Sequence, residues 1–228
     1  MERKLEEMEY LDIFPPDSVE AIKGRRGLKK INFIMGNFFW FKRKVKNSLS
    51  FLDKPAVFLE IGAGDGSLGQ FLYRDSLLRQ KMNLTGLDRI PRPQGWPKDW
   101  NWIRMDLFEF IKCKDFVDSS SFQGILANMV LHHFSSSQLE GLGEWINKIK
   151  PSFLFFCEPL RSGLTLVELS LLRLVGLNPI TFHDGLLSIK SGFYGDELPV
   201  FLGLHRVDWP YQIKMTWLGA YRFEAIVK

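Results

Sequence analysis

Cysteine is scarce in this chain: its 228 residues include two, Cys113 and Cys157. Two thiols cannot build a disulfide framework or a four-thiolate metal site, so we expect a cytoplasmic protein in a reducing environment. Long apolar runs are also lacking, because the two best candidates, residues 31–41 and 164–177, are too short to span a bilayer. The first twenty residues are acidic and lack the apolar core of a signal peptide.

The positive charge is confined to one end of the chain. The formal net charge is +4, from 30 Lys and Arg against 26 Asp and Glu. Residues 1–50 hold eleven Lys and Arg against seven Asp and Glu, which leaves 19 of each for residues 51–228. The basic residues of this N-terminal segment flank an aromatic stretch, residues 31–41. A neutral remainder makes nucleic acid an unfavoured partner, whereas the basic segment favours peripheral contact with a membrane surface.

Apolar runs and helical patterns alternate through the middle of the chain. Strands are expected at Ala56–Ile61, Leu84–Leu87, Trp102–Met105, Gly124–Met129 and Phe153–Cys157, with helices near residues 67–80, 135–149 and 163–176. This alternation is typical of an α/β fold with a doubly wound, mostly parallel sheet.

The two ends of the chain depart from that alternation. Val207–Met215 and Tyr221–Val227 have no helix between them and therefore predict an antiparallel terminal pair, which makes seven strands. Apolar spacing predicts an amphipathic helix over residues 27–52 that breaks near Gly36. We therefore expect an N-terminal helical cap, residues 1–52, and a domain that covers residues 53–228.

A cluster of glycines follows the first predicted strand. Gly62, Gly64 and Gly66 alternate after an acidic residue, Glu60. The spacing differs from the G-x-G-x-x-G of dinucleotide sites, and a carboxylate would repel a pyrophosphate. The same carboxylate accepts hydrogen bonds from a cationic amino-acid group. The loop therefore favours S-adenosylmethionine over NAD.

With these features the chain resembles the class I S-adenosylmethionine-dependent methyltransferases, over residues 53–228. The resemblance implies that Asp88, at the end of the second strand, accepts hydrogen bonds from the ribose and that Arg89 borders the adenine. It implies that Asp106 accepts from the adenine amino group while Leu107 packs on the ring. Asn128 begins the family's fourth motif, where the methyl donor meets its acceptor.

The fourth motif narrows the acceptor. Residues 128–134 lack the Asn/Asp-Pro-Pro-aromatic pattern of enzymes that methylate exocyclic amines, and resemble small-molecule methyltransferases of quinone and phenolic-lipid biosynthesis. The resemblance thus implies O- or C-methylation of a small aromatic, quinone-like or polyketide-like acceptor. Two alternatives stay open: an RNA methyltransferase that uses the basic N-terminal segment, and a catalytically silent scaffold that only binds the cofactor.

Three residues are candidates for catalysis. His132 lies just past the fourth strand, although a paired histidine such as His132-His133 is more often structural. His183 is followed by a carboxylate, Asp184, that would raise its basicity, or the two form a surface turn. Glu158 ends the fifth strand on the same rim.

Each of these residues has a structural alternative or a limit. For Glu158 the alternative is a salt bridge with Arg161 or a helix cap. The histidines lack H-x-H or H-x-x-x-H spacing, so no metal site is expected. Residues 38–41 are dense in aromatic side chains and predict a lid over an apolar acceptor pocket. The oligomeric state is left open.

Overall fold

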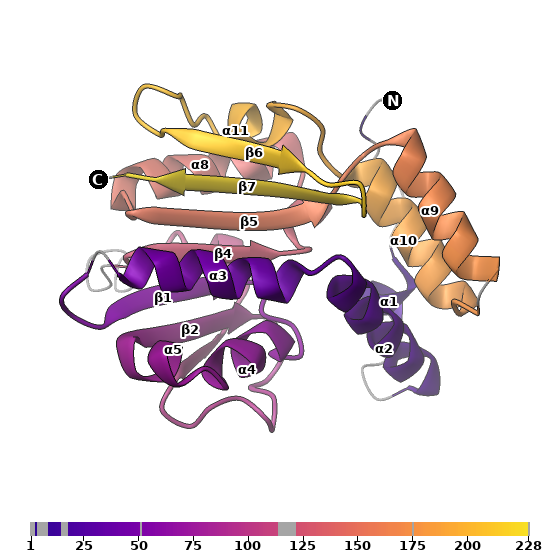
Figure 1. Ribbon diagram of the computed structural model, residues 1–228, viewed down its shortest axis with the longest axis horizontal. Coiled ribbons are helices and arrows are strands. Elements are labelled where there is room, and N and C mark those ends of the chain that lie inside the picture. The colour runs from indigo at the N-terminus through magenta and orange to yellow at the C-terminus, as the bar shows by residue number, and fades with distance from the viewer. Residues whose placement is uncertain are drawn as a thin grey trace.

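The computed structural model describes residues 3, 9–14, 18–50, 52–113, 122–174 and 176–227. The predicted cap, residues 1–52, therefore lies partly outside the described residues. Within them, a single mixed sheet carries helices on both faces (Figure 1). No helix of the described part is long and apolar enough to cross a bilayer.

The sheet has the order β3-β2-β1-β4-β5-β7-β6 over the described residues. Its strands are β1 (Ala56–Ile61), β2 (Met82–Asp88), β3 (Asn101–Arg104), β4 (Gly124–Asn128), β5 (Phe153–Pro159), β6 (Tyr211–Met215) and β7 (Ala220–Ile226). The first five strands pair in parallel, while β7 runs antiparallel to both β5 and β6. The predicted fold class is confirmed, including the antiparallel strand near the end of the chain.

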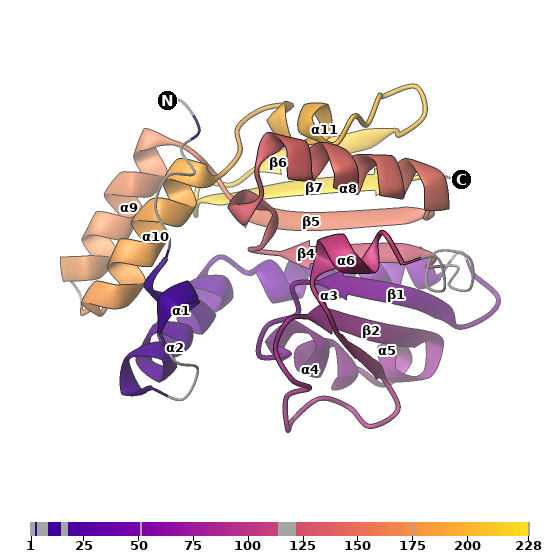
Figure 2. The same ribbon diagram turned by 180° about the vertical axis from the view of Figure 1, so that it is seen from behind.

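The helices divide between the two faces and one edge of the sheet. They are α1 (Tyr10–Ile13), α2 (Val19–Ile34), α3 (Asn37–Leu49), α4 (Ser67–Tyr73), α5 (Ser76–Lys81), α6 (Leu107–Phe110), the 3-10 turn η1 (Leu131–His133), α8 (Ser136–Ile149), α9 (Gly163–Leu174), α10 (Pro179–Ser191) and α11 (Glu197–Phe201). One apolar core forms between the sheet and α3, α4 and α5 (Figure 1). The other forms against α6, α8 and α11 (Figure 2).

Local chemistry explains where several helices begin. The predicted helix over residues 67–80 is two helices, because the Asp75 side chain accepts the backbone N–H groups of Leu77 and Leu78 and starts α5. Ser135 caps α8 through a capping box with Gln138. Gly36, at φ 66°, separates α2 from α3 as expected, but α2 starts at Val19 rather than near residue 27.

Two aromatic residues of α3, Trp40 and Phe41, belong to the apolar core rather than to a lid. Phe41 is fully buried, and Trp40 packs edge-on to Phe155 of β5 at a centroid distance of 6.1 Å. The lid prediction is therefore wrong for these two residues, since they anchor α3 to the sheet. Phe39 is half exposed and packs on Phe71 of α4.

Four helices gather beyond the carboxyl ends of the parallel strands. Both views place α1, α2, α9 and α10 there as one helical group (Figures 1 and 2). The sequence pattern predicted α9 but not α10, although Asn178 caps α10 and Pro179 is its first residue. Open α/β sheets bind ligands at this carboxyl edge, so the four helices border the expected site.

Candidate functional site

The glycine loop after β1 is open at one position and tightly packed at another. Gly62, Gly64 and Gly66 all have positive φ, at 64°, 54° and 73°. A Cβ on Gly62 would lie 2.5 Å from Cγ2 of Val130, so only glycine permits this contact. A Cβ on Gly64 would meet nothing closer than 4.0 Å. The loop therefore presents bare backbone to open space at Gly64.

Asp88 holds the loop in this shape. Its Oδ2 accepts the Gly64 N–H at 2.8 Å, and its Oδ1 accepts the Ile90 N–H at 3.1 Å. Both bonds leave acceptor capacity on the carboxylate. Asp88 therefore lies where the resemblance requires it, and its predicted role toward a ribose stays a prediction.

Glu60 supplies a buried carboxyl group behind the loop. Its side chain is 2% exposed, and its Oε2 has no hydrogen-bond partner among the described residues. Burial, together with the charges of Asp65 and Asp88, holds the pKa of Glu60 well above its ordinary value. An unpartnered, buried carboxyl group fits a ligand that brings a cationic donor to this position.

Two further cofactor candidates already have structural duties. Asp106 caps α6, because its side chain accepts the Phe108 N–H at 2.7 Å. The amide of Asn128 donates to Oδ1 of Asn32 in α2 at 3.3 Å, which ties the end of β4 to the N-terminal helices. No local pattern predicts this asparagine pair, because Asn32 and Asn128 are far apart in the chain. Contact of Asp106 or Asn128 with a cofactor stays a prediction.

The remaining two cofactor candidates differ in exposure. Leu107 is buried at the start of α6, whereas Arg89 is exposed beyond β2. The backbone carbonyl of Arg89 accepts a hydrogen bond from Arg104 Nε at 3.2 Å. Their predicted roles at the adenine ring also stay predictions.

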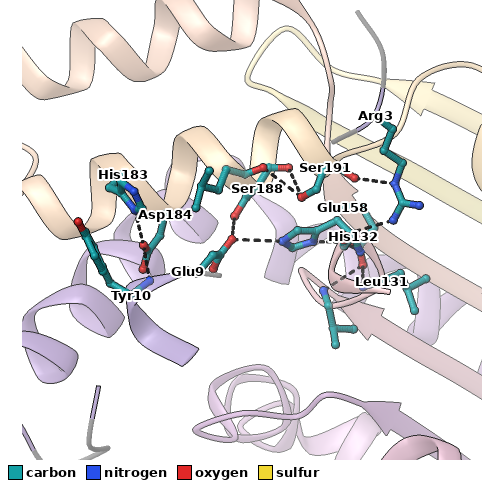
Figure 3. Close-up of polar contacts among 12 residues, drawn as sticks. Arg3, Glu9, Tyr10, Leu131, His132, Glu158, His183, Asp184, Ser188 and Ser191 are labelled. Carbon is teal, nitrogen blue, oxygen red and sulfur yellow. Dashed lines mark hydrogen bonds and ion pairs between the residues drawn. The ribbon is translucent and has the colours of Figure 1, made fainter. Parts of the chain in front are cut away.

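His132 and Glu158, both predicted as catalytic candidates, lie against each other at the carboxyl ends of β4 and β5 (Figure 3). His132 Nδ1 is 2.7 Å from Glu158 Oε2, and the Glu158 carboxylate also accepts the backbone N–H groups of Val130, Leu131 and His132. Glu158 is fully buried and His132 is 1% exposed. The alternative prediction of a salt bridge between Glu158 and Arg161 is wrong, since Arg161 pairs with Glu197 instead.

A second carboxylate faces the other ring nitrogen. Glu9 Oε1 lies 3.7 Å from His132 Nε2, which is an ion-pair distance. Burial alone would lower the pKa of His132, but Glu158 and Glu9 on its two sides raise it to about 9. Burial alone would raise the pKa of Glu9, but its contact with His132 leaves it below the ordinary value. At neutral pH the ring is thus an imidazolium between two carboxylates.

One polar cluster in this region invites a test for a metal. Potential ligand atoms of Glu9, His132 and His133 lie within 4.8 Å of one another. A metal-binding imidazole must lose its proton, and the high pKa of His132 works against that loss. The arrangement therefore fits a proton on His132 better than a cation.

The third catalytic candidate, His183, is held apart from this pair. Its Nδ1 is 3.2 Å from Oδ1 of the adjacent Asp184, and its ring stacks on Tyr10 at 4.1 Å. Figure 3 shows it at the other end of the labelled group from His132 and Glu158. The Tyr10 N–H donates to Asp184 at 2.8 Å, so these residues dock α1 on α10. The geometry gives His183 a structural duty, and its catalytic role stays a prediction.

Sequence reasoning missed Glu9 and Arg3, which come from the N-terminal end. Arg3 donates to the backbone carbonyls of His132, Phe134 and Ser191, at 3.3, 2.7 and 2.9 Å. Its guanidinium also lies 4.7 Å from the Phe193 ring centre. No local motif marks either residue, because both reach the rim only through the tertiary fold.

Comparison with solved structures supports the fold. The plantazolicin methyltransferase BamL, solved with a triazolic desmethylPZN analog and SAH, superposes with a TM-score of 0.67 at 12% identity, over 96% of this chain and 92% of that one. BpumL, a plantazolicin methyltransferase solved with SAH, gives 0.64 at 13% identity, over 93% and 92%. The pyocyanin biosynthetic protein PhzM gives 0.58 at 15%, over 96% and 61%.

No protein-family model and no curated protein sequence matches the chain. At these identities the superpositions show a shared fold. The chain therefore has the fold of S-adenosylmethionine-dependent methyltransferases, as its motifs predicted.

Proposed function

We propose that this protein is an S-adenosylmethionine-dependent methyltransferase that acts on a small molecule. The observation that carries the proposal is the buried carboxyl group of Glu60, whose Oε2 has no hydrogen-bond partner among the described residues, behind an open Gly64. Solved proteins of the same fold bind SAH or SAM, as in the BpumL structure and that of human N-acetylserotonin methyltransferase. The residues present at the loop fit such a group.

The residues that would hold the cofactor are those of the glycine loop and the strand ends beside it: Glu60, Gly62, Gly64, Gly66, Asp88, Arg89, Asp106, Leu107 and Asn128. When bound, S-adenosylmethionine supplies an activated methyl group on a sulfonium. Glu60 binds the cationic amino group, and Asp88 keeps the loop in place while its free lone pairs accept from a ribose.

His132 and Glu158 would act on the acceptor. Methyl transfer is an in-line displacement, so the protein contributes mainly alignment and control of the acceptor's charge. An imidazolium at His132 stabilises the ionised form of an acceptor oxygen, so a larger fraction of the acceptor is present as the nucleophilic oxyanion. Glu158 fixes the ring and sustains its charge. This arrangement favours O-methylation over C-methylation of an aromatic, quinone-like or polyketide-like acceptor.

The two alternatives have less support. The basic side chains of α2 that an RNA methyltransferase would use, such as Lys23, Arg26 and Lys30, lie on a groove whose other wall includes Leu172 of α9 and Leu177 between α9 and α10. A mixed basic and apolar groove is better suited to a membrane surface, so peripheral membrane contact stays part of the proposal. A cytoplasmic location and the division into a cap, residues 1–52, and a catalytic domain, residues 53–228, also stay predictions.

Calorimetric titration with SAH tests the proposal directly. Saturable binding that weakens by about tenfold in Glu60→Gln, where a charged hydrogen-bond acceptor is lost, is expected. The matched control is Glu20→Gln, since Glu20 is exposed on α2 far along the chain from the loop. Absence of SAH binding at millimolar concentration contradicts the proposal.

Turnover separates an enzyme from a silent scaffold. SAH release from S-adenosylmethionine in the presence of a panel of phenols and aromatic carboxylic acids is expected, and loss of that release in His132→Asn assigns it to this site. SAH binding without release for any acceptor would favour the scaffold.

A further inference from the structure

The carboxylate of Glu9 faces the ring nitrogen of His132 that Glu158 does not contact. Figure 3 shows it pointing at the ring of His132 from the side opposite Glu158. The two carboxylates thus take the two ring nitrogens, with Glu158 on Nδ1 at 2.7 Å and Glu9 on Nε2 at 3.7 Å. Only Nε2 is left for a ligand, because Glu158 is part of the protein's buried framework.

The contact on Nε2 is an incomplete one. At 3.7 Å the Glu9 oxygen is beyond hydrogen-bond range, and Nε2 has no hydrogen-bond partner among the described residues. A buried N–H donor without an acceptor costs free energy. A ligand oxygen that approached Nε2 to hydrogen-bond distance would recover that free energy.

The two carboxylates are anchored to very different degrees. Glu158 accepts three backbone N–H groups in addition to the His132 ring, and it sits at the end of a strand paired on both sides. Among the described residues, Glu9 accepts a hydrogen bond from the Ser188 hydroxyl and lies near the His133 ring, and it immediately precedes the four-residue helix α1. Displacing Glu9 therefore disrupts fewer bonds than displacing Glu158.

Other charged groups near the ring do not alter this picture. His133 of η1 lies beside it, with ring centres 4.2 Å apart. Arg3 reaches the backbone carbonyl of His132, and its charge also lies near Glu158 and Glu197. Asp184 of α10 is engaged with Tyr10 and His183. Glu9 and Glu158 remain the carboxylates in contact with the His132 ring.

We infer that Glu9 is a built-in substitute for the methyl acceptor, and that the acceptor which displaces it presents an anionic oxygen, a carboxylate or an ionised acidic hydroxyl. The inference rests on the proposed function, since it names the acceptor class of the same site. In the reaction, the acceptor oxygen supplies the electron pair of the new O–CH₃ bond. The C–S bond breaks, its pair stays on sulfur, and sulfur becomes neutral. No proton moves, which suits a site whose histidine already carries one.

The test uses two probes of matched shape and opposite charge, benzoate and benzylamine, at pH 6. There an ordinary histidine is largely protonated and benzoate is ionised. Benzoate is expected to bind Glu9→Gln about tenfold more tightly than the wild type, because it no longer competes with a tethered carboxylate. Benzylamine is expected to show no such gain. Glu20→Gln is the matched control and should leave the affinity for benzoate unchanged.

A spectroscopic measurement checks the same contact without any ligand. Imidazole NMR should show the pKa of His132 falling by about one unit in Glu9→Gln, and rising again on addition of benzoate. Ser188→Ala keeps Glu9 but frees its carboxylate from the Ser188 hydroxyl. Like Glu9→Gln, this variant should raise the affinity for benzoate and lower the pKa of His132, but by smaller amounts. This second variant keeps the test valid if Glu9→Gln folds poorly.

Three outcomes overturn the inference. The first is that benzoate binds Glu9→Gln and the wild type with equal affinity. The second is that benzoate still binds Glu9→Gln after His132→Asn is added. The third is that benzylamine binds the wild type and that Glu9→Gln abolishes this binding. The last result would make Glu9 a receptor for a cationic acceptor. SAH binding, measured on the same samples, is independent of all three, so failure of the proposed function is recognised separately.

Discussion

The glycine loop after β1 and the His132–Glu158 pair after β4 and β5 lie at the same edge of the sheet but are assembled differently. The loop and its hydrogen-bond partners come from residues 60–88. Gly64 faces open space, and Oε2 of Glu60 has no hydrogen-bond partner in the described part of the chain. The rim around His132 draws on segments far apart in the chain, from Glu9 to Ser188, and its polar groups contact one another, although Nε2 of His132 lacks a hydrogen-bond partner among the described residues. A short local motif can serve a ligand common to many proteins. A site specific to one acceptor needs distant segments.

The largest effect is expected at the rim, from Glu158→Ala. Removing this buried carboxylate leaves three backbone N–H groups and Nδ1 of His132 without their acceptor, so the free energy of unfolding should fall by about 3–5 kcal/mol. Asp196→Ala, which removes the exposed partner of the exposed Arg206, should cost much less. Equal losses for the two variants would mean that the rim is no more rigid than the surface.

The next effect concerns Gly62, where the two regions touch. Gly62→Ala adds a Cβ at 2.5 Å from Val130 and at positive φ, and overpacking together with strain should destabilise the fold by about 2–4 kcal/mol. Gly64→Ala shares the positive φ without the clash, so it should cost about 1–2 kcal/mol. Thermal and denaturant unfolding measure both. If Gly64→Ala were the more destabilising, the loop would not open where the structure has it open.

Asp88→Ala should separate the two regions by function. Loss of hydrogen bonds to the Gly64 loop and to a ribose should weaken S-adenosylmethionine binding by about 1–3 kcal/mol, several-fold to a hundredfold. The pKa of His132 should be unchanged, since its carboxylate neighbours are Glu9 and Glu158. Calorimetry and imidazole NMR give the two readings. An unchanged affinity would contradict the role of Asp88 in binding the cofactor.

The smallest expected effect is the release of a proton from Glu60 when the cofactor binds. The pKa of Glu60 is raised, so its carboxyl group is protonated more readily than an ordinary one when no cation is near. A cationic amino group beside it favours the ionised form, so binding should release up to about one proton, and affinity should rise with pH below the raised pKa. Titrations in buffers of different ionisation enthalpy detect the release, and Glu60→Gln should remove it. Proton uptake on binding would reverse the assigned role.

Features built from neighbouring residues could be predicted from the sequence, whereas contacts between distant segments could not. The positions of the strands along the chain and the mostly parallel sheet could be predicted, because buried parallel strands are short apolar runs that alternate with helices. The glycine loop could be found because its residues are neighbours. The start of α10 was missed although Asn178 and Pro179 mark it, and its apolar pattern is weak because it packs among helices on several sides. Glu9 could not be found, since nothing near it in the chain shows that it would meet a histidine more than one hundred residues away.

The pairing of β5 also has a consequence for folding. All seven residues of β5 are buried, and one of its two edges is covered by β7, which begins only at Ala220. During synthesis or refolding that edge stays bare until β7 arrives, and β6 cannot join the sheet before β7 does. A bare apolar strand edge is a template for intermolecular pairing. Shortening or destabilising β7 should therefore show itself first as aggregation during expression, rather than as a weakened rim around His132.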